Sequence, residues 1–79
     1  MSYQGHASWA QWNVSLWVNN DEGLYKMAKR YAQYRRGYSS RRDGAIAMLK
    51  DLNDSQVFKT PDGATYTVTS LINAMRGLS

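Results

Sequence analysis

Cysteine is absent from this chain, histidine and proline occur once each, and no long apolar run is present. Without cysteine the chain has no disulfide, no thiolate metal site and no cysteine nucleophile. Small secreted domains usually depend on disulfides, so this composition favours a reducing, cytoplasmic setting. Residues 1–20 contain no Lys, Arg, Asp or Glu, and polar side chains interrupt each apolar run there. We therefore expect neither a signal peptide nor a membrane-spanning helix.

The residue types that carry most catalysis are also scarce. His6 is the one histidine, and it has no cysteine or second histidine at a metal-binding spacing. The six glycines are scattered, so the sequence has no glycine-rich phosphate loop. A serine nucleophile needs a base, and His6 is the one candidate. The segment 51–54 lacks the spacing, the central glycine and the closing Glu of a calcium-binding EF-hand loop. The sequence thus predicts a protein that is not an enzyme and that holds no metal or cofactor.

The length and the aromatic content set expectations for the core. The 79 residues suffice for one domain, 1–79, with residues 1–7 as a flexible N-terminal tail. A chain this short buries only about 60% of the surface that its unfolded form exposes. Three Trp and six Tyr are many for this length, and each such side chain buries on the order of 150–250 Å². We expect one Trp/Tyr-rich core; a homodimer that buries tryptophans between two copies is the alternative.

Residues 8–18 fit two kinds of secondary structure. Trp9, Trp12 and Leu16 recur at helical spacing, but apolar and polar residues also alternate over 12–18, as they do in a strand. Ser8 is a favourable N-cap. A helix over 8–18 is therefore our prediction, and a strand remains the alternative.

Two more helices are predicted in the middle of the chain. Asn19 is the expected N-cap of the first, with Glu22 three residues later as in a capping box. This helix should run to about Arg36, with Gly37 directly after its end. Ser39 or Ser40 should cap the next helix, which we expect to end near Asn53.

The C-terminal part predicts a β-hairpin followed by a helix. The hairpin should span 56–67 around the turn 60–63 (TPDG), in which proline presets the first turn position and glycine closes the turn. Thr67 or Thr69 should cap a last helix that runs to about Leu78. The predicted fold is mainly α: three or four short helices around one core, with a small β-hairpin.

Seven of the ten Lys and Arg residues lie between positions 26 and 42, and the next acidic residue is Asp43. This is a local basic patch rather than a generally basic protein. Arginine binds phosphate in a bidentate manner, and tyrosine stacks on unpaired bases. Three interpretations of this patch stay open: a solvated helix face, a contact with nucleic acid, and a contact with an acidic protein surface. The candidate partner-binding residues are Lys26, Lys29, Arg30, Tyr34, Arg35, Arg36, Tyr38, Arg41 and Arg42.

The run from Trp12 to Tyr25 (WNVSLWVNNDEGLY) resembles a signature of small proteins of unknown function in phages, prophages and other mobile elements. Those proteins carry a Trp-Asn-Val-x-Leu-Trp core followed by Asn-Asp-Glu-Gly-Leu-Tyr. They often carry a Thr-Pro-Asp-Gly turn near the C-terminus, as at 60–63 here. The close match covers about 18 of the 79 residues, and no catalytic residue is carried over from the resemblance.

The resemblance implies a setting for this protein. Small accessory proteins of mobile elements are often stoichiometric inhibitors of host defence, anti-CRISPR proteins among them. It therefore implies an inhibitor in the host cytoplasm that binds a host defence protein or a nucleoprotein complex. Inhibitors that mimic nucleic acid are strongly acidic, whereas this chain has a net charge of +4. An acidic protein surface or a nucleoprotein is thus the expected partner. A small nucleic-acid-binding accessory protein using the same basic patch is the alternative.

Overall fold

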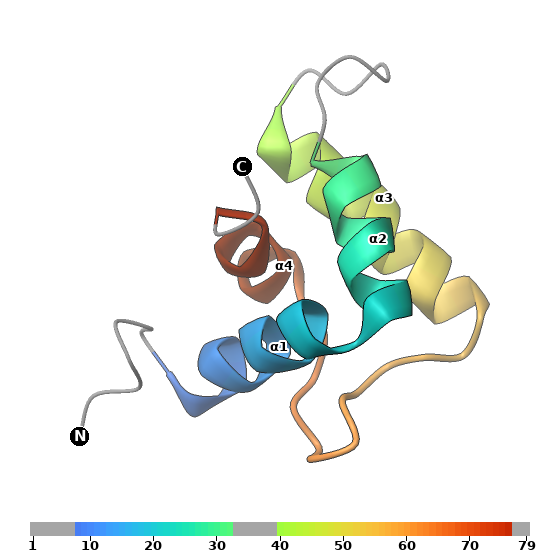
Figure 1. The fold of residues 1–79 in the computed structure, drawn as a ribbon. Helices are drawn as coiled ribbons and strands as arrows, with labels where there is room; N and C mark the ends of the chain where they lie inside the picture. Colours follow the sequence, from blue (N-terminus) through green and yellow to red (C-terminus); the bar gives the residue numbers. More distant parts are fainter. Residues whose placement is uncertain (1–7, 33–39, 77–79) are drawn as a thin grey trace.

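Four helices make up the described part of the chain, residues 8–32 and 40–76 of a computed structural model (Figure 1). They are α1 (Trp9–Asn20), α2 (Glu22–Tyr31), α3 (Arg41–Asp54) and α4 (Val68–Met75). α4 packs against α1 and α3, and α2 packs against α1 and α3 as well, so all four enclose one core. The predicted mainly α fold is confirmed. Among these four helices, none has the length and apolar character that a membrane crossing requires.

The core is aliphatic rather than rich in tryptophan. All three tryptophans lie outside the set of buried hydrophobic residues: Trp9 is 39% exposed, and Trp12 and Trp17 are partly buried. The predicted Trp/Tyr-rich core is therefore wrong, with Tyr66 as the one aromatic member of the buried set. The buried hydrophobic residues are Val14, Val18, Ala28, Ala45, Met48, Leu52, Ala64, Tyr66, Leu71, Ala74 and Met75.

The helix α1 explains why the tryptophans are not central. Ser8 caps it as predicted, since its hydroxyl accepts a hydrogen bond from the backbone nitrogen of Gln11 at 3.2 Å. Val14 and Val18, one turn apart, are fully buried, which is the 3.6-residue period of a helix. The helix prediction is confirmed and the strand alternative is wrong. α1 makes its most extensive contact with α4.

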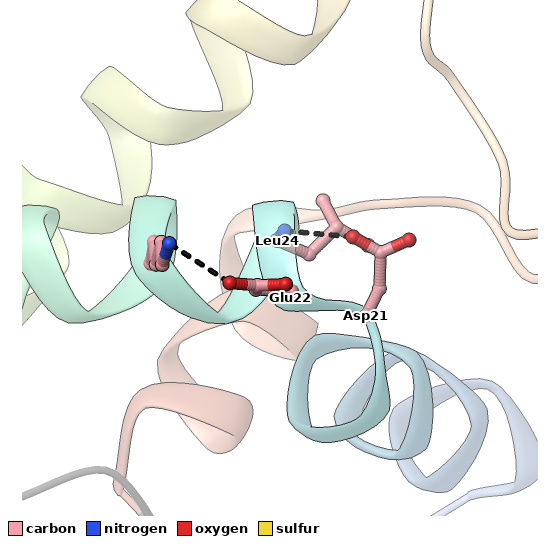
Figure 2. Close-up of polar contacts among 4 residues, drawn as sticks. Asp21, Glu22 and Leu24 are labelled. Carbon is pink, nitrogen blue, oxygen red and sulfur yellow. Dashed lines mark hydrogen bonds and ion pairs between the residues drawn. The ribbon is translucent and has the colours of Figure 1, made fainter.

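A single residue, Asp21, separates α1 from α2 (Figure 2). Its backbone is extended, with φ −97° and ψ 119°. Its backbone nitrogen donates to the carbonyl oxygen of Trp17 at 2.9 Å and so closes α1. Its carboxylate oxygen accepts from the backbone nitrogen of Leu24 at 2.9 Å and caps α2. One residue thus ends one helix and begins the next.

The predicted cap at Asn19 is wrong by two residues. The side-chain amide of Asn19 donates to the carbonyl oxygen of Ser15 at 2.8 Å, one turn earlier, and Asn19 remains inside α1. Glu22 is consequently the first residue of α2 rather than the third-position partner of a capping box. Its negative charge still suits the positive end of the helix dipole.

The helix α2 ends at Tyr31, with Ala32 as its C-cap residue, and not near Arg36 as predicted. The predicted cap residues Gly37 and Ser39 lie in 33–39, outside the described residues. Ser40 does cap α3, because its hydroxyl accepts from the backbone nitrogen of Asp43 at 3.2 Å.

The helices α2 and α3 touch at Gly44. A Cβ atom at this position would overlap the backbone carbonyl group of Tyr31, so glycine is needed for the close approach. The hydroxyl of Tyr31 donates a hydrogen bond to the carboxylate of Asp51, farther along α3. The end of α2 is therefore held against α3 by contacts at Gly44 and Asp51.

The helix α3 ends at Asp54, one residue beyond the predicted Asn53. Gln56 then adopts a left-handed backbone, with φ 62°. Its backbone nitrogen donates to the carbonyl oxygen of Asn53 at 2.9 Å, and that of Val57 donates to Leu52 at 2.8 Å. This pair of bonds is a Schellman motif, in which glycine is the usual residue at the left-handed position.

The segment predicted as a β-hairpin, 56–67, contains one antiparallel bridge, between Lys59 and Thr65. The turn itself is confirmed: the backbone nitrogen of Gly63 donates to the carbonyl oxygen of Thr60 at 2.9 Å, and Gly63 has φ 95°. Two-stranded ribbons are only marginally stable on their own. The chain keeps the tight turn but not two regular strands, and the turn is held by side chains of α1 instead.

Thr67, one of the two predicted cap positions, caps α4. The cap is reciprocal, because the Thr67 hydroxyl accepts from the Ser70 backbone nitrogen at 3.1 Å and the Ser70 hydroxyl accepts from the Thr67 nitrogen at 2.9 Å. α4 buries Leu71 and Met75. Leu78 lies outside the described residues.

Candidate functional site

Five of the nine predicted partner-binding residues lie in the described part of the chain: Lys26, Lys29, Arg30, Arg41 and Arg42. The remaining four, Tyr34, Arg35, Arg36 and Tyr38, fall in 33–39, outside the described residues. Of the five, Arg41 is partly buried and the others are exposed. The candidate surface is therefore built from the cations of α2 and of the first turn of α3.

Lys26 is paired within its own helix. Its Nζ lies 2.9 Å from Oε1 of Glu22, one turn earlier (Figure 2), and the two side chains are 72% and 81% exposed. Such exposed pairs contribute only about 0.3–0.5 kcal/mol. The pair nevertheless balances the charge of Lys26 locally, so Lys26 is the weakest of the five candidates for contact with an anionic partner.

Lys29 and Arg30 are placed over aromatic rings of the same helix. The Nζ of Lys29 lies 5.8 Å from the ring centre of Tyr25, and Cζ of Arg30 lies 5.6 Å from that of Tyr31. Exposed cation–π contacts are worth about 0.5–1 kcal/mol. A ring does not neutralise the charge, so both cations retain their field while their side chains are held against α2.

The end of α2 and the start of α3 bring four of these cations together. Tyr31 contacts Gly44, and each of the four lies within about one helical turn of that contact. Arg76, the C-cap residue of α4, lines a pocket with Arg42. We call this set the basic end of the molecule: Lys29, Arg30, Arg41, Arg42 and Arg76.

The carboxylates are distributed in the opposite way. Figure 1 shows α2 running towards the basic end and α3 running away from it. The start of α2 carries Asp21 and Glu22, and α3 ends at Asp54. Asp51 lies between the two ends, where its carboxylate accepts the hydrogen bond from Tyr31. Asp43 lies in the first turn of α3, beside the basic end, where its charge suits the helix dipole. Positive charge is thus concentrated at the basic end, and three of the six carboxylates lie at the opposite end of the α2–α3 pair.

Sequence reasoning missed Arg76 and its neighbours. Thr69, Asn73 and Arg76 follow one face of α4 at helical spacing, which the sequence shows. Their position beside Arg42, 27 to 34 residues earlier in the sequence, depends on how α3 packs on α4. The sequence shows that these three residues share one face of α4, but it does not show that Arg42 lies beside that face.

Asp62 is the most highly connected carboxylate outside the basic end. One of its oxygens accepts hydrogen bonds from the side-chain amide of Asn13 and from the indole nitrogen of Trp17, each at 2.9 Å. These two bonds lower the pKa of Asp62 below its ordinary value, and the bond from Asn13 has the larger effect. Asp62 is therefore an ionised acceptor that fastens the turn to α1, which is a structural role.

Asn13 completes the attachment from inside the protein. It is only 1% exposed, and its side-chain oxygen accepts from the hydroxyl of Thr60 at 2.6 Å. The Thr60 hydroxyl in turn accepts from the backbone nitrogen of Ala64 at 3.0 Å. We call Asn13, Trp17, Thr60 and Asp62 the α1–turn clasp.

Two large apolar side chains of α1 are exposed. Trp9 and Leu16, two turns apart on the same face, are 39% and 37% exposed. A homodimer that covers this face stays a prediction, and a doubled mass in solution at micromolar concentration would reveal it. In the described ranges 8–32 and 40–76, no group of three or more His, Cys, Asp or Glu side chains is arranged to hold a metal ion.

Comparison with known proteins places the chain in a family. Residues 1–76 match the family of unknown function DUF7249, so the chain belongs to that family. No curated protein and no solved structure shows significant similarity to it.

Proposed function

We propose that this protein acts by stoichiometric binding, with its basic end placed against an acidic surface of a host macromolecular complex. The observation that carries this proposal is the charge separation along α2 and α3. Five cations from three helices gather at one end, while three of the six carboxylates, Asp21, Glu22 and Asp54, lie at the other end of the α2–α3 pair. The electrostatic field of such a charge distribution steers a partner of opposite charge and fixes its orientation.

The resemblance of residues 12–25 to proteins of phages and mobile elements suggests the kind of complex. The partner is a host defence protein or nucleoprotein complex in the cytoplasm, and the protein acts as an anti-CRISPR-like inhibitor. Occupation of an interface needs no catalytic residue. It needs a rigid charged surface, and the helices that meet at Tyr31 and Gly44 provide one.

Phage plating on a defended host tests this function. The protein is expressed in cells that carry an active CRISPR or other defence system, and plating of a targeted phage is compared with that on cells lacking the protein. Wild type should raise plating, and the double variant Lys29→Glu/Arg41→Glu should not. The matched control Lys50→Glu/Lys59→Glu makes the same charge change outside the basic end and should behave as wild type. Unchanged plating with wild-type protein across the defence systems tried would refute the inhibitor proposal.

A small nucleic-acid-binding accessory protein is the second candidate. It is favoured by Arg42 and Arg76, two guanidinium groups that line one pocket, since arginine suits phosphate. Titration with duplex and single-stranded nucleic acid at about 50 mM salt tests it, because phosphate contacts give a log–log salt slope of about −0.9 per phosphate on duplex DNA. If neither duplex nor single-stranded nucleic acid binds at this salt concentration, the nucleic-acid-binding function is ruled out.

A further inference from the structure

A pocket of about 320 Å³ lies where α1, α3 and α4 meet. α4 supplies most of its wall, α1 one residue and the first turn of α3 one residue. The lining residues are Gln11, Arg42, Thr69, Ile72, Asn73 and Arg76. This volume falls in the range of about 300–1,000 Å³ that is typical of small-molecule sites.

The charges of the lining specify an anion. Arg42 and Arg76 come from different helices and both are exposed, so their guanidinium groups are accessible. No carboxylate belongs to the lining residues of this pocket. Paired guanidinium groups bind the oxygens of a phosphate with bidentate, charge-assisted hydrogen bonds.

The remainder of the pocket specifies more than a phosphate. Gln11 and Thr69 offer side-chain donors and acceptors, and Ile72 is a partly buried apolar side chain. An amide can bond the polar edge of a nucleobase, and an apolar side chain can cover the face of the base. A volume of this size also leaves room beyond a single phosphate group. The combination fits a phosphate joined to a polar, flat group.

We propose that this pocket binds a nucleoside phosphate, with Arg42 and Arg76 on the phosphate and Gln11 and Thr69 on the sugar or base. The ligand is a free nucleotide or one nucleotide of a single strand, and both sources share this chemistry. The inference goes beyond the inhibitor proposal and does not require a host complex, and in its single-strand form it deepens the nucleic-acid-binding alternative. A protein that inhibits a defence complex and one that does not would both carry this pocket.

Titration monitored by ¹H–¹⁵N chemical shifts tests the proposal on the full chain. The probes are the four nucleoside 5′-monophosphates, inorganic phosphate and a short single-stranded oligonucleotide. Arg42→Ala and Arg76→Ala each remove one guanidinium group, and Lys50→Ala removes a lysine charge from α3 outside the pocket. The spectral dispersion of each variant tests whether it is folded.

A nucleotide should shift the amide signals of Gln11, Thr69 and Ile72. Each Arg→Ala change should weaken its binding about tenfold or more, and Lys50→Ala should leave it unchanged. Binding of the mononucleotides identifies a free nucleotide as sufficient, whereas binding of the oligonucleotide alone identifies the strand as the source. Shifts with inorganic phosphate alone, no shifts at these residues, or equal binding by the Arg→Ala variants would each overturn the proposal. A negative result here would leave the phage-plating test unaffected.

Discussion

The indole nitrogen of Trp17 donates a hydrogen bond to a carboxylate oxygen of Asp62 at 2.9 Å, although 45 residues separate them in the sequence. Asn13, one turn earlier on α1, donates to the same oxygen at 2.9 Å. The two segments that carry the resemblance to mobile-element proteins, 12–25 and 60–63, therefore meet in space. In this structure these residues of the signature hold the fold together, and the candidate binding surface lies elsewhere.

Replacing Asp62 by Asn should reduce the pH dependence of stability. Hydrogen bonds from Asn13 and Trp17 lower the pKa of Asp62 below its ordinary value of 3.8. A lowered folded-state pKa means that the carboxylate stabilises the fold above the unfolded-state pKa. This contribution is lost as the pH falls through the folded-state value. Urea unfolding between about pH 7 and 2 should thus show a smaller acid-induced loss of stability for Asp62→Asn than for wild type.

A control for this prediction is Asp54→Asn, an exposed carboxylate at the end of α3 that takes no part in the α1–turn clasp. Its pH profile should run parallel to that of wild type. If the profile of Asp62→Asn also runs parallel to that of wild type, the clasp does not depend on the ionised carboxylate.

Removing the buried amide of Asn13 should destabilise the protein. Asn13→Ala leaves the hydroxyl of Thr60 without its acceptor and Asp62 without one donor. Loss of a buried hydrogen-bond partner costs about 1–3 kcal/mol, which chemical denaturation would measure. The exposed residue Asn53 gives the control, because Asn53→Ala should change the unfolding free energy by no more than about 0.5 kcal/mol. Equal effects of the two substitutions would show that the clasp contributes little.

Alanine at position 44 should be destabilising, although alanine is the better helix former by about 1 kcal/mol. Its Cβ would overlap the carbonyl group of Tyr31 and push α2 away from α3. Overpacking of this kind typically costs 1–3 kcal/mol, and since the opposing atoms are backbone, we expect a net loss of at least about 1 kcal/mol. The other helical glycine, Gly23, has only the side-chain oxygen of Asp21 near its Cβ position, at 3.3 Å. Gly23→Ala should therefore cost less, and the reverse order in thermal denaturation would contradict the close approach.

Glycine at position 56 should stabilise the protein. Gln56 has φ 62°, a conformation that is strained for residues with a side chain. Gln56→Gly removes that strain, and after the larger backbone entropy of glycine is counted, the gain is about 0.5–1 kcal/mol. Ser55→Gly is the matched control, because Ser55 has φ −90° and gains nothing from glycine. A lower melting temperature for Gln56→Gly than for wild type would refute this interpretation of the end of α3.

Local signals in the sequence predicted most of the helices, and tertiary contacts decided the rest. Ser8 was the predicted cap of α1, and Ser40 and Thr67 were each one of two predicted positions, because their hydroxyls lie before helical patterns. Each of the three accepts the expected bond. The position of Asn19 was not decided locally, since Asn19 can cap a helix or bond one turn back within it. The expectation of a tryptophan-rich core was wrong because the stripe of Trp9 and the stripe of Val14 are both apolar, and the sequence favoured the larger side chains. Packing against α4 selected the stripe with the smaller side chains.

The candidate site was also predictable only in part, because some of its features depend on one helix and others on contacts between helices. The cluster of cations between 26 and 42 is visible as a run of one charge in the sequence. The ion pair of Lys26 with Glu22 was also predictable from their spacing of four residues. The position of Arg76 beside Arg42 was not, since it requires α4 to pack against α3. A sequence pattern shows which residues share a helix face, but not which second helix that face will meet.

Affinity purification from host lysate, with quantification of each recovered component, tests the central claim most directly. The bait proteins are wild type, Lys29→Glu/Arg41→Glu and the control Lys50→Glu/Lys59→Glu. A contact through the basic end predicts a component that wild type and the control recover equally, and that the Lys29→Glu/Arg41→Glu variant recovers about tenfold less or not at all. Equal recovery by all three proteins, or recovery of no defence component by wild type, would contradict the claim.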